Sequence, residues 1–441
     1  MNLSRLPLVA LIAVLCTVAP WTNAVTTELS GRFRIKAEGV TDVVAAGRQG
    51  SDQLGLTRLL LKGSINEGNW GATAELLDAR SWLDDASTPI GNSDVNTLEP
   101  LQAYISWRSK GDAGEMRQIS AGRMTADFMS RRLLSRSNDS NAPHSFVGVY
   151  SQLNHTDRSF DAFFLYPMRR RPSDRNAIDN NERSLDRRLE HTHLWGLGLE
   201  QALEASTLRG YVLGLNEDDE HRNATRQREL VNLGVQWLRK PETGQLDHDI
   251  DIVYQHGKSK LSSSDPTRLD HRAWMATLHS GYQYADRGFN RVFFNLDYAS
   301  GDQSPSDGEN NRFDRLYGST SSDFGPPARV YGAFTRENII TPWLGLSFRY
   351  PRVNGFIAYR EIFLADDSDR LRGAKLQDST GSSGRHAGSQ LEARLRASPT
   401  DSIKLQFGAA YLIRQRFMED APGAQGYDNS FAGYGQIEFF F

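Results

Sequence analysis

The sequence predicts an all-β fold, a transmembrane antiparallel up-and-down β-barrel of the outer-membrane type. Three observations predict it: an export leader, strands that alternate polar and apolar residues along the whole chain, and connections of two distinct lengths. The 441 residues have a mean hydropathy of -0.53 and a formal net charge of -3. The hydropathy excludes a bundle of membrane helices, and the balanced charge argues against nucleic acid as a partner.

The leader is an apolar run from Leu6 to Ala19 that follows a basic start. It is shorter than the roughly 20 apolar residues of a membrane-spanning helix. With the small-residue site Thr22-Asn23-Ala24 it has the features of a secretory signal. We therefore expect a signal peptide over residues 1–24 and a mature barrel over residues 25–441.

Cys16 is the only cysteine in the sequence, and Leu15 precedes it where a lipoprotein signal requires Gly or Ala. Cleavage after Ala24 would leave a mature chain without disulfides, so an exported protein of this size needs another source of stability. A closed ladder of strands supplies it, because every backbone group is paired and no edge remains.

The strands after residue 25 alternate with period two. The first places Arg32, Arg34 and Lys36 opposite an apolar face, and the same pattern recurs over 101–108, 231–237, 249–255, 292–299, 390–397 and 403–411. A soluble β-sandwich is the alternative, but the two-faced pattern recurs without strands that are apolar on both sides. Alternation over about 10 residues is typical of transmembrane barrel strands.

The connections are either short turns or long polar stretches. Short turns fall at 66–69, 110–112, 240–244, 286–288, 351–354 and 398–401, and long stretches at 79–97, 124–144, 169–190, 217–226, 258–271, 301–329, 365–388 and 418–428. Outer-membrane barrels join short periplasmic turns to long extracellular loops in this way, with an even number of strands. We count about 18 strands, with 16 as the alternative.

The last strand places apolar residues at alternate positions, at Phe431, Gly433, Gly435, Ile437, Phe439 and Phe441. This pattern resembles the C-terminal signal by which barrel proteins are recognised for outer-membrane assembly. We therefore expect the assembly machinery and the lipid bilayer as partners. Aromatic residues form 10% of the chain, and several near strand ends suit interfacial girdles.

Cationic residues gather on the polar faces of these strands, at Arg32, Arg34, Lys36, Arg58, Lys62, Arg108, Arg349, Arg394, Arg396 and Lys404. Rings of Arg and Lys in a pore select anions, and the arginine fork matches a carboxylate. The alternative is that they pair across the lumen with Glu38, Glu75, Asp78, Asp249, Asp251, Asp297, Glu392 and Glu438. We favour a residual cationic zone, opposed by an acidic row at Asp247, Asp249 and Asp251.

The predicted pore-lining and substrate-binding residues are Arg34, Lys36, Arg58, Lys62, Glu75, Asp78, Arg80, Arg108, Arg123, Arg349, Arg394 and Arg396. For the constriction we select Arg34, Arg58, Arg108, Arg123 and Arg394.

No motif predicts catalysis, a metal or a cofactor. Asp247-x-Asp249-x-Asp251 lacks the glycine of a calcium loop, because Ile252 follows. His191-x-His193 has no third ligand at a suitable spacing. Gly-x-Ser-x-Gly and His-Glu-x-x-His motifs are missing from the sequence. We therefore expect a protein that is not an enzyme.

Several stretches in order resemble the alginate-export family of outer-membrane porins. They are 75–81 (ELLDARS), 101–104 (LQAY), 121–123 (AGR), 131–133 (RRL), 298–302 (YASGD) and 313–317 (FDRLY). Met124 and Arg315 depart from the family's pattern. The resemblance implies an 18-stranded monomer in the outer membrane of a Gram-negative bacterium, with lumen arginines that attract a uronate polymer.

The expected function is passive, selective passage of an anionic saccharide, such as alginate or a similar uronate, or of a small organic acid. A nutrient-uptake porin for other small solutes is the first alternative. An outer-membrane hydrolase with its site at the barrel rim is the second. Because a pore has no intrinsic direction, export and uptake are equally compatible with these residues.

Overall fold

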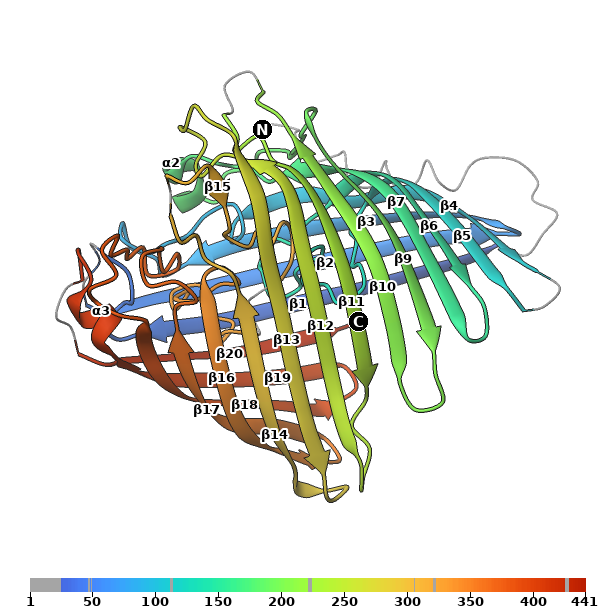
Figure 1. Cartoon of the computed structure of the whole chain (residues 1–441). Helices are drawn as coiled ribbons and strands as arrows, with labels where there is room; N and C mark the ends of the chain where they lie inside the picture. The colour runs from blue at the N-terminus through green and yellow to red at the C-terminus, as the bar shows by residue number, and fades with distance from the viewer. Residues whose placement is uncertain are drawn as a thin grey trace, which may run out of the picture.

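The computed structural model describes residues 25–441 apart from 47, 49, 112–113, 221–223, 305, 320–322 and 425–427. The expected signal peptide, residues 1–24, lies outside the described residues. The regular secondary structure of the described chain is almost entirely strands (Figure 1), with two short helices, α2 (Arg175–Asp179) and α3 (Arg416–Asp420), in long connections. Over that part of the chain, no helix combines the length and the apolarity needed to cross a membrane.

Eighteen long strands within the described residues form the wall, which confirms the predicted count. They are β1 (Thr26–Val40), β2 (Asp52–Glu67), β3 (Trp70–Trp82), β4 (Asn96–Lys110), β5 (Met116–Met124), β6 (Phe146–Asn154), β7 (Arg158–Arg169), β9 (Thr192–Ala202), β10 (Thr207–Glu217), β11 (Glu229–Arg239), β12 (Leu246–Ser259), β13 (Leu269–Gln283), β14 (Gly288–Ala299), β16 (Ile339–Tyr350), β17 (Val353–Phe363), β18 (His386–Thr400), β19 (Ile403–Arg414) and β20 (Ser430–Phe440). Two short pieces, β8 (Arg187–Arg188) and β15 (Glu309–Asn310), pair with the ends of β7 and β13.

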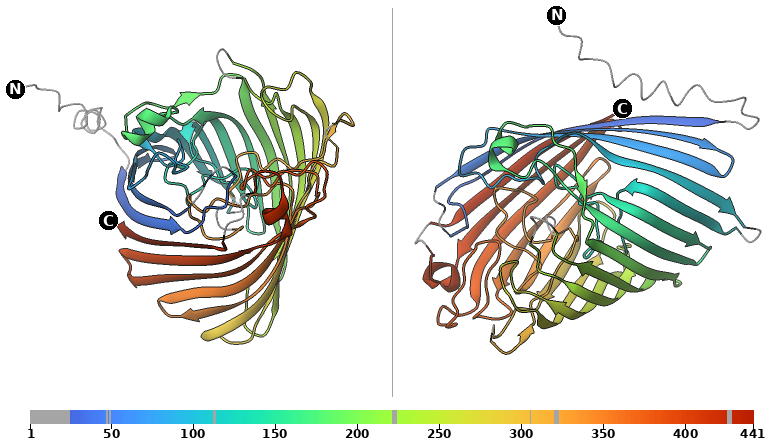
Figure 2. Two further views of the ribbon diagram at one scale, coloured as in Figure 1. Left: turned by 90° about the vertical axis from the view of Figure 1, so that its left-hand side faces the viewer. Right: turned by 90° about the horizontal axis from the view of Figure 1, so that it is seen from above.

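The wall closes because its last strand pairs with its first. β20 runs antiparallel to β1 in a register from Arg32↔Phe440 to Val40↔Ala432. One step further, the amide N–H of Gly31 donates to the carbonyl of Phe441 at 2.6 Å. Figure 2 shows the two strands side by side at this seam. The fold is therefore a closed antiparallel barrel without a sheet edge, as predicted, and the sandwich alternative is wrong.

The period-two alternation corresponds to an outer and an inner face of the wall. On β11, Leu233 and Val235 are 54% and 55% exposed, whereas Asn232 and Gln236 on either side of them are 0% and 3% exposed. Apolar side chains on the outer face and polar ones on the inner face are the arrangement that a barrel adopts in a bilayer. Four aromatic residues near strand ends are also exposed, namely Trp70 (60%), Trp237, Trp274 and Tyr284, whereas Trp107 is half-buried.

All long connections lie at one end of the barrel, and eight of them match the predicted loops. Sequence analysis missed the ninth, residues 41–51, which contains Val43 and Val44. Both valines are buried. Figure 2 shows that part of the long-loop chain lies inside the ring of strands rather than outside it.

The arrangement of loops predicts the orientation of the barrel in the membrane. Short turns face the periplasm in outer-membrane barrels. A protease site inserted within 304–311 or 379–384 should therefore be cleaved on intact cells, whereas one at Glu242-Thr243, in the β11–β12 turn, should be cleaved only after lysis. Cleavage at Glu242-Thr243 on intact cells, with protection of the other two sites, would refute this orientation.

Candidate functional site

Two long connections fold into the barrel and contact each other there. We call residues 125–145 the first lumen loop and residues 300–338 the second lumen loop. The amide of Tyr317 donates to the carbonyl of Leu133 at 3.0 Å, and the amide of Ser135 donates to the carbonyl of Tyr317 at 3.2 Å. An added Cβ on Gly318 would overlap the carbonyl of Arg132. Glycine thus permits this close approach, and the two loops form one partition across the lumen.

The first lumen loop is attached to β12 and to β3 by arginines. Arg132 donates to Asp249 at 2.9 Å and to Asp251 at 3.0 Å, and Arg136 holds both oxygens of Glu75 at 3.0 Å. Bidentate and charge-assisted bonds of this kind are among the strongest polar contacts in proteins. The β12 end of the partition is therefore firmly held.

The predicted acidic row is consequently not free. Asp249 and Asp251 bind Arg132, and Asp247 binds Arg291 at 2.7 Å. The row was predicted to oppose a cationic zone, and in the structure its charges are balanced locally by Arg132 and Arg291. The row lies on the lumen face of β12 as alternation predicted, but the first lumen loop covers most of it.

On the opposite wall, two of the arginines selected for the constriction come together and hold the same loop. Arg34 and Arg58 are 3% and 2% exposed, and both donate to the backbone carbonyls of Asn138 and Ser140 at 2.8–3.2 Å. Arg58 also contacts Glu438 at 3.2 Å. Both arginines lie on the predicted lumen face, but they bind the partition and are not open to solute.

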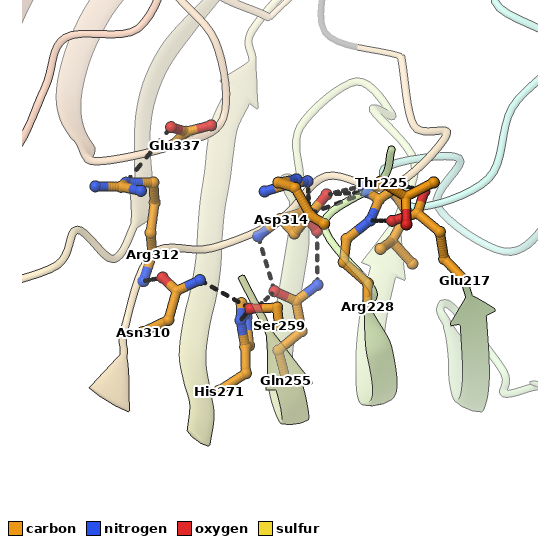
Figure 3. A network of polar contacts seen from close by, with 12 residues as sticks. Glu217, Thr225, Arg228, Gln255, Ser259, His271, Asn310, Arg312, Asp314 and Glu337 are labelled. Carbon is orange, nitrogen blue, oxygen red and sulfur yellow. Dashed lines mark hydrogen bonds and ion pairs between the residues drawn. The ribbon is translucent and has the colours of Figure 1, made fainter. Parts of the chain in front are cut away.

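The second lumen loop is fixed to the β10–β13 wall by the polar network in Figure 3. Arg228 reaches Asp314 at 3.1 Å and Glu217 at 2.6 Å, and Gln255 receives the amide of Asp314 at 2.8 Å. Burial would raise the pKa of Asp314, but Arg226 and Arg228 hold it well below its usual range. Asp314 is thus a firmly ionised anchor of the loop.

The network continues along the same loop. His271 lies between Gln255 and Ser259, at 3.2 Å and 2.9 Å, and Asn310 donates to Ser259 at 2.8 Å. Arg312 then binds Asp369 of the 364–385 loop (Figure 3 shows its contact with Glu337). The second lumen loop is therefore joined both to the wall and to a neighbouring loop.

At its other end the second lumen loop meets β1. Lys36 donates to the carbonyl of Pro327 and lies 3.8 Å from Glu38, which accepts from the amide of Arg329. Arg329 in turn lies 3.2 Å from Asp94. The predicted pore-lining residue Lys36 is thus on the lumen face, within a mixed cluster of both charges.

A group of lumen-facing cations on neighbouring strands is left open, and we call it the cationic arc. Its members are Arg32, Lys62, Arg349, Arg394, Arg396 and Lys404, on β1, β2, β16, β18 and β19. Arg32 is 3.8 Å from Glu438, while Arg394 and Lys404 stack over the rings of Phe356 and Phe440. Among the described residues, the last five members of the arc have no carboxylate at ion-pair distance.

Two predicted site residues near the barrel ends have other environments. Arg108 is exposed near the short-turn end and donates to Gln118 and Asn66 at 3.1 Å and 3.2 Å. Arg123 binds Glu99 and, at 2.7 Å, Asp186. Arg123, which was predicted for the constriction, is thus ion-paired with one carboxylate of β4 and one of the 170–191 loop.

Asp78 and Arg80 were assigned to the pore, and this assignment is wrong. On β3 they pair in register with Leu59 and Thr57 of β2. Leu59 and Thr57 flank the inward-facing Arg58, so they lie on the outer face. Asp78 and Arg80, as their partners, lie on the outer face too. Asp78 and Arg80 instead bind each other at 2.9 Å. Of the three predicted site residues in this stretch, only Glu75 points into the lumen, because side chains alternate along a strand.

A cavity of about 480 Å³ lies between the two lumen loops, β1 and the 83–95 and 170–191 loops. Sequence analysis missed the residues that give it its chemistry, chiefly Asp94, His144, Arg170, Arg315 and Tyr331. Burial lowers the pKa of Arg170 to about 10. Burial, Arg170 and Arg315 lower the pKa of His144 well below its usual value. The only signals were an arginine run at 169–171 and the unusual Arg315.

Metal-binding groups are not found in the described part of the chain: no three or more His, Cys, Asp or Glu side chains converge there. His191 contacts the carbonyl of Asp219, and His193 stacks on Phe164. The two histidines of the His-x-His pattern thus have separate structural roles.

The fold is similar to solved outer-membrane porins. Pseudomonas aeruginosa OccK2 (OpdF) has a TM-score of 0.59 at 12% identity, with 94% of this chain and 97% of that chain covered. A BenF-like porin from Pseudomonas fluorescens Pf-5 and Acinetobacter baumannii OccAB3 both reach a TM-score of 0.60, at 10% and 11% identity, with 94% of this chain and 99% of theirs covered. No curated protein sequence matches the chain significantly.

The alginate export family model matches residues 25–429, which is nearly the whole barrel. Its fold is that of a channel, with a closed antiparallel wall and a polar lumen. The chain therefore belongs to the alginate export family and is an outer-membrane channel protein.

Proposed function

We propose that the protein is a passive channel for anionic saccharides or small organic acids that carry a carboxylate. The cationic arc is the observation that supports this proposal. Five of its members lie on the lumen face without a carboxylate at ion-pair distance among the described residues. A pore lining with charges of one sign, between walls of low dielectric constant, raises the local concentration of ions of the opposite charge. An anionic solute entering this lumen would bring these cations the carboxylate partners that the wall does not supply.

Small sugar acids and aromatic acids are the solutes that we favour. One structure of Pseudomonas aeruginosa OccK2 is a complex with glucuronate, and one of OpdK contains vanillate. The first matches this chain with a TM-score of 0.59 and the second with 0.56. The two-loop partition also favours small solutes over an extended polymer. Uptake of such acids and export of a uronate are therefore the two candidate roles.

The test is the reversal potential of single channels under a salt gradient in planar bilayers. The wild-type channel should prefer chloride over potassium. Arg394→Glu combined with Arg396→Glu should lower that preference by about threefold or more, because both positions belong to the arc. The matched control is Arg183→Glu with Arg187→Glu, two exposed arginines of the 170–191 loop, which should leave it unchanged. A cation-selective wild-type channel would overturn the proposal.

We further propose that the protein works as a monomer in the outer membrane of a Gram-negative bacterium, after export by residues 1–24. The alternating β20, with Phe431 51% exposed and Phe441 68% exposed, supports recognition by the assembly machinery. We propose no catalytic role and no cofactor for the protein.

A further inference from the structure

We propose that the cavity between the lumen loops is a binding site for one uronate unit, whose carboxylate is held by Arg170, Arg315 and His144. This inference rests on the proposed passage of anions and adds the place where the solute stops. It assigns recognition to loop residues, whereas the cationic arc on the wall attracts anions into the lumen.

The two arginines differ from the other cations that line the cavity. Lys36, Arg329 and Arg372 each lie within 4 Å of a carboxylate, at 3.8 Å, 3.2 Å and 2.6 Å. Arg170 donates to the carbonyl of Ala142, and Arg315 donates to the carbonyl of Gly318 at 2.8 Å. Across the described residues, neither has a carboxylate at ion-pair distance.

Arg170 and Arg315 are half-buried. A charge withdrawn from water without a counter-ion is costly, and a backbone carbonyl compensates only part of the cost. Asp94 and Asp186 attract Arg170 from beyond ion-pair distance, while Arg315 repels it. A carboxylate placed between the two guanidinium groups would supply the missing partner and could accept two parallel hydrogen bonds from an arginine.

His144 completes the proposed subsite. It lines the same cavity, and its ring contacts Tyr317 edge-on with the centroids 5.8 Å apart. Because burial and the two arginines keep it neutral near pH 7, the imidazole presents one N–H donor and one acceptor. The N–H of His144 can donate to the carboxylate, and the other ring nitrogen can accept a hydrogen bond from a sugar hydroxyl.

The size and the rest of the lining agree with a sugar acid. A volume of about 480 Å³ falls within the range of sites for single small ligands. Asp94 offers a carboxylate oxygen for a hydroxyl, and Phe324 and Tyr331 offer ring faces for the apolar side of a sugar. Because the lumen loops bound the cavity, a bound unit would sit beside the partition.

The experiment is block of single-channel current by glucuronate, with glucose at equal concentration as the neutral probe. Glucuronate should interrupt the wild-type current in a saturable way, and glucose should not. Arg170→Gln and Arg315→Gln should each raise the blocking constant at least tenfold while the channel remains anion-selective, because the arc is intact. Arg183→Gln, an exposed arginine of the same loop as Arg170, is the matched control.

Arg315→Lys keeps the positive charge but lacks the guanidinium fork. Its blocking constant for glucuronate should therefore lie between those of wild type and Arg315→Gln. Arg315→Lys also stands in for Arg315→Gln if that variant fails to show the heat-modifiable migration of a folded barrel. The inference is overturned if the wild-type channel is anion-selective but not blocked, or if Arg170→Gln and the Arg315 variants are blocked as strongly as wild type. A cation-selective wild type would instead overturn the proposed function itself.

Discussion

Replacement of Arg132 by methionine should destabilise the barrel by about 3–5 kcal/mol, the usual cost of removing one partner of a buried ion pair. Arg132 contacts Asp249 and Asp251 together, and the side chain of Asp251 is 0% exposed. Methionine fills a similar volume but leaves both carboxylates without their cation. The midpoint of unfolding in guanidinium, followed in detergent by tryptophan fluorescence, measures the loss.

Two further variants distinguish this ion pair from general damage to the loop. Arg131→Met changes the exposed neighbour, whose contact with Ser319 is made by its backbone carbonyl, so its unfolding midpoint should match wild type. Asp251→Asn in the Arg132→Met background removes the buried charge and should recover part of the stability. A midpoint for Arg132→Met equal to that of Arg131→Met would contradict the anchoring role of Arg132.

The wall was predictable from sequence because alternation is a local property. Leu233 and Asn232 face opposite sides of the wall because successive side chains of a strand point to opposite faces. This can be predicted without knowledge of any distant contact. The same rule could have excluded Asp78 and Arg80 from the pore. They alternate with Glu75, Leu77 and Ala79, but the 75–81 stretch was treated as a single motif.

The partition was not predictable, because its contacts join residues far apart in the chain. Arg132 lies 119 residues before Asp251, and Arg34 lies 106 residues before Ser140. Alternation places Arg34 and Arg58 on the lumen face, but it does not reveal which group they bind there. Nothing in a polar loop sequence distinguishes a loop that turns inward from one that extends outward. Arg170 and Arg315 were missed for this reason.

The contact between the lumen loops leads to the second large effect. Gly318→Ala should separate the two loops and raise single-channel conductance about twofold or more. An alanine Cβ at this position would overlap the carbonyl group and the following amide nitrogen of the Arg132 peptide, and backbone atoms do not yield as the end of a flexible side chain does. The anchors on both loops oppose local relaxation, since Arg132, Arg228 and Gln255 hold them to the wall.

Gly91→Ala is the matched control, because a Cβ there meets only the end of the Arg329 side chain, at 3.8 Å. Its conductance should equal that of wild type. Gly318→Ala should also weaken block by glucuronate, because the carbonyl of Gly318 positions the guanidinium group of Arg315. Folded Gly318→Ala protein with wild-type conductance and wild-type block would mean that the lumen is not limited where the two loops meet.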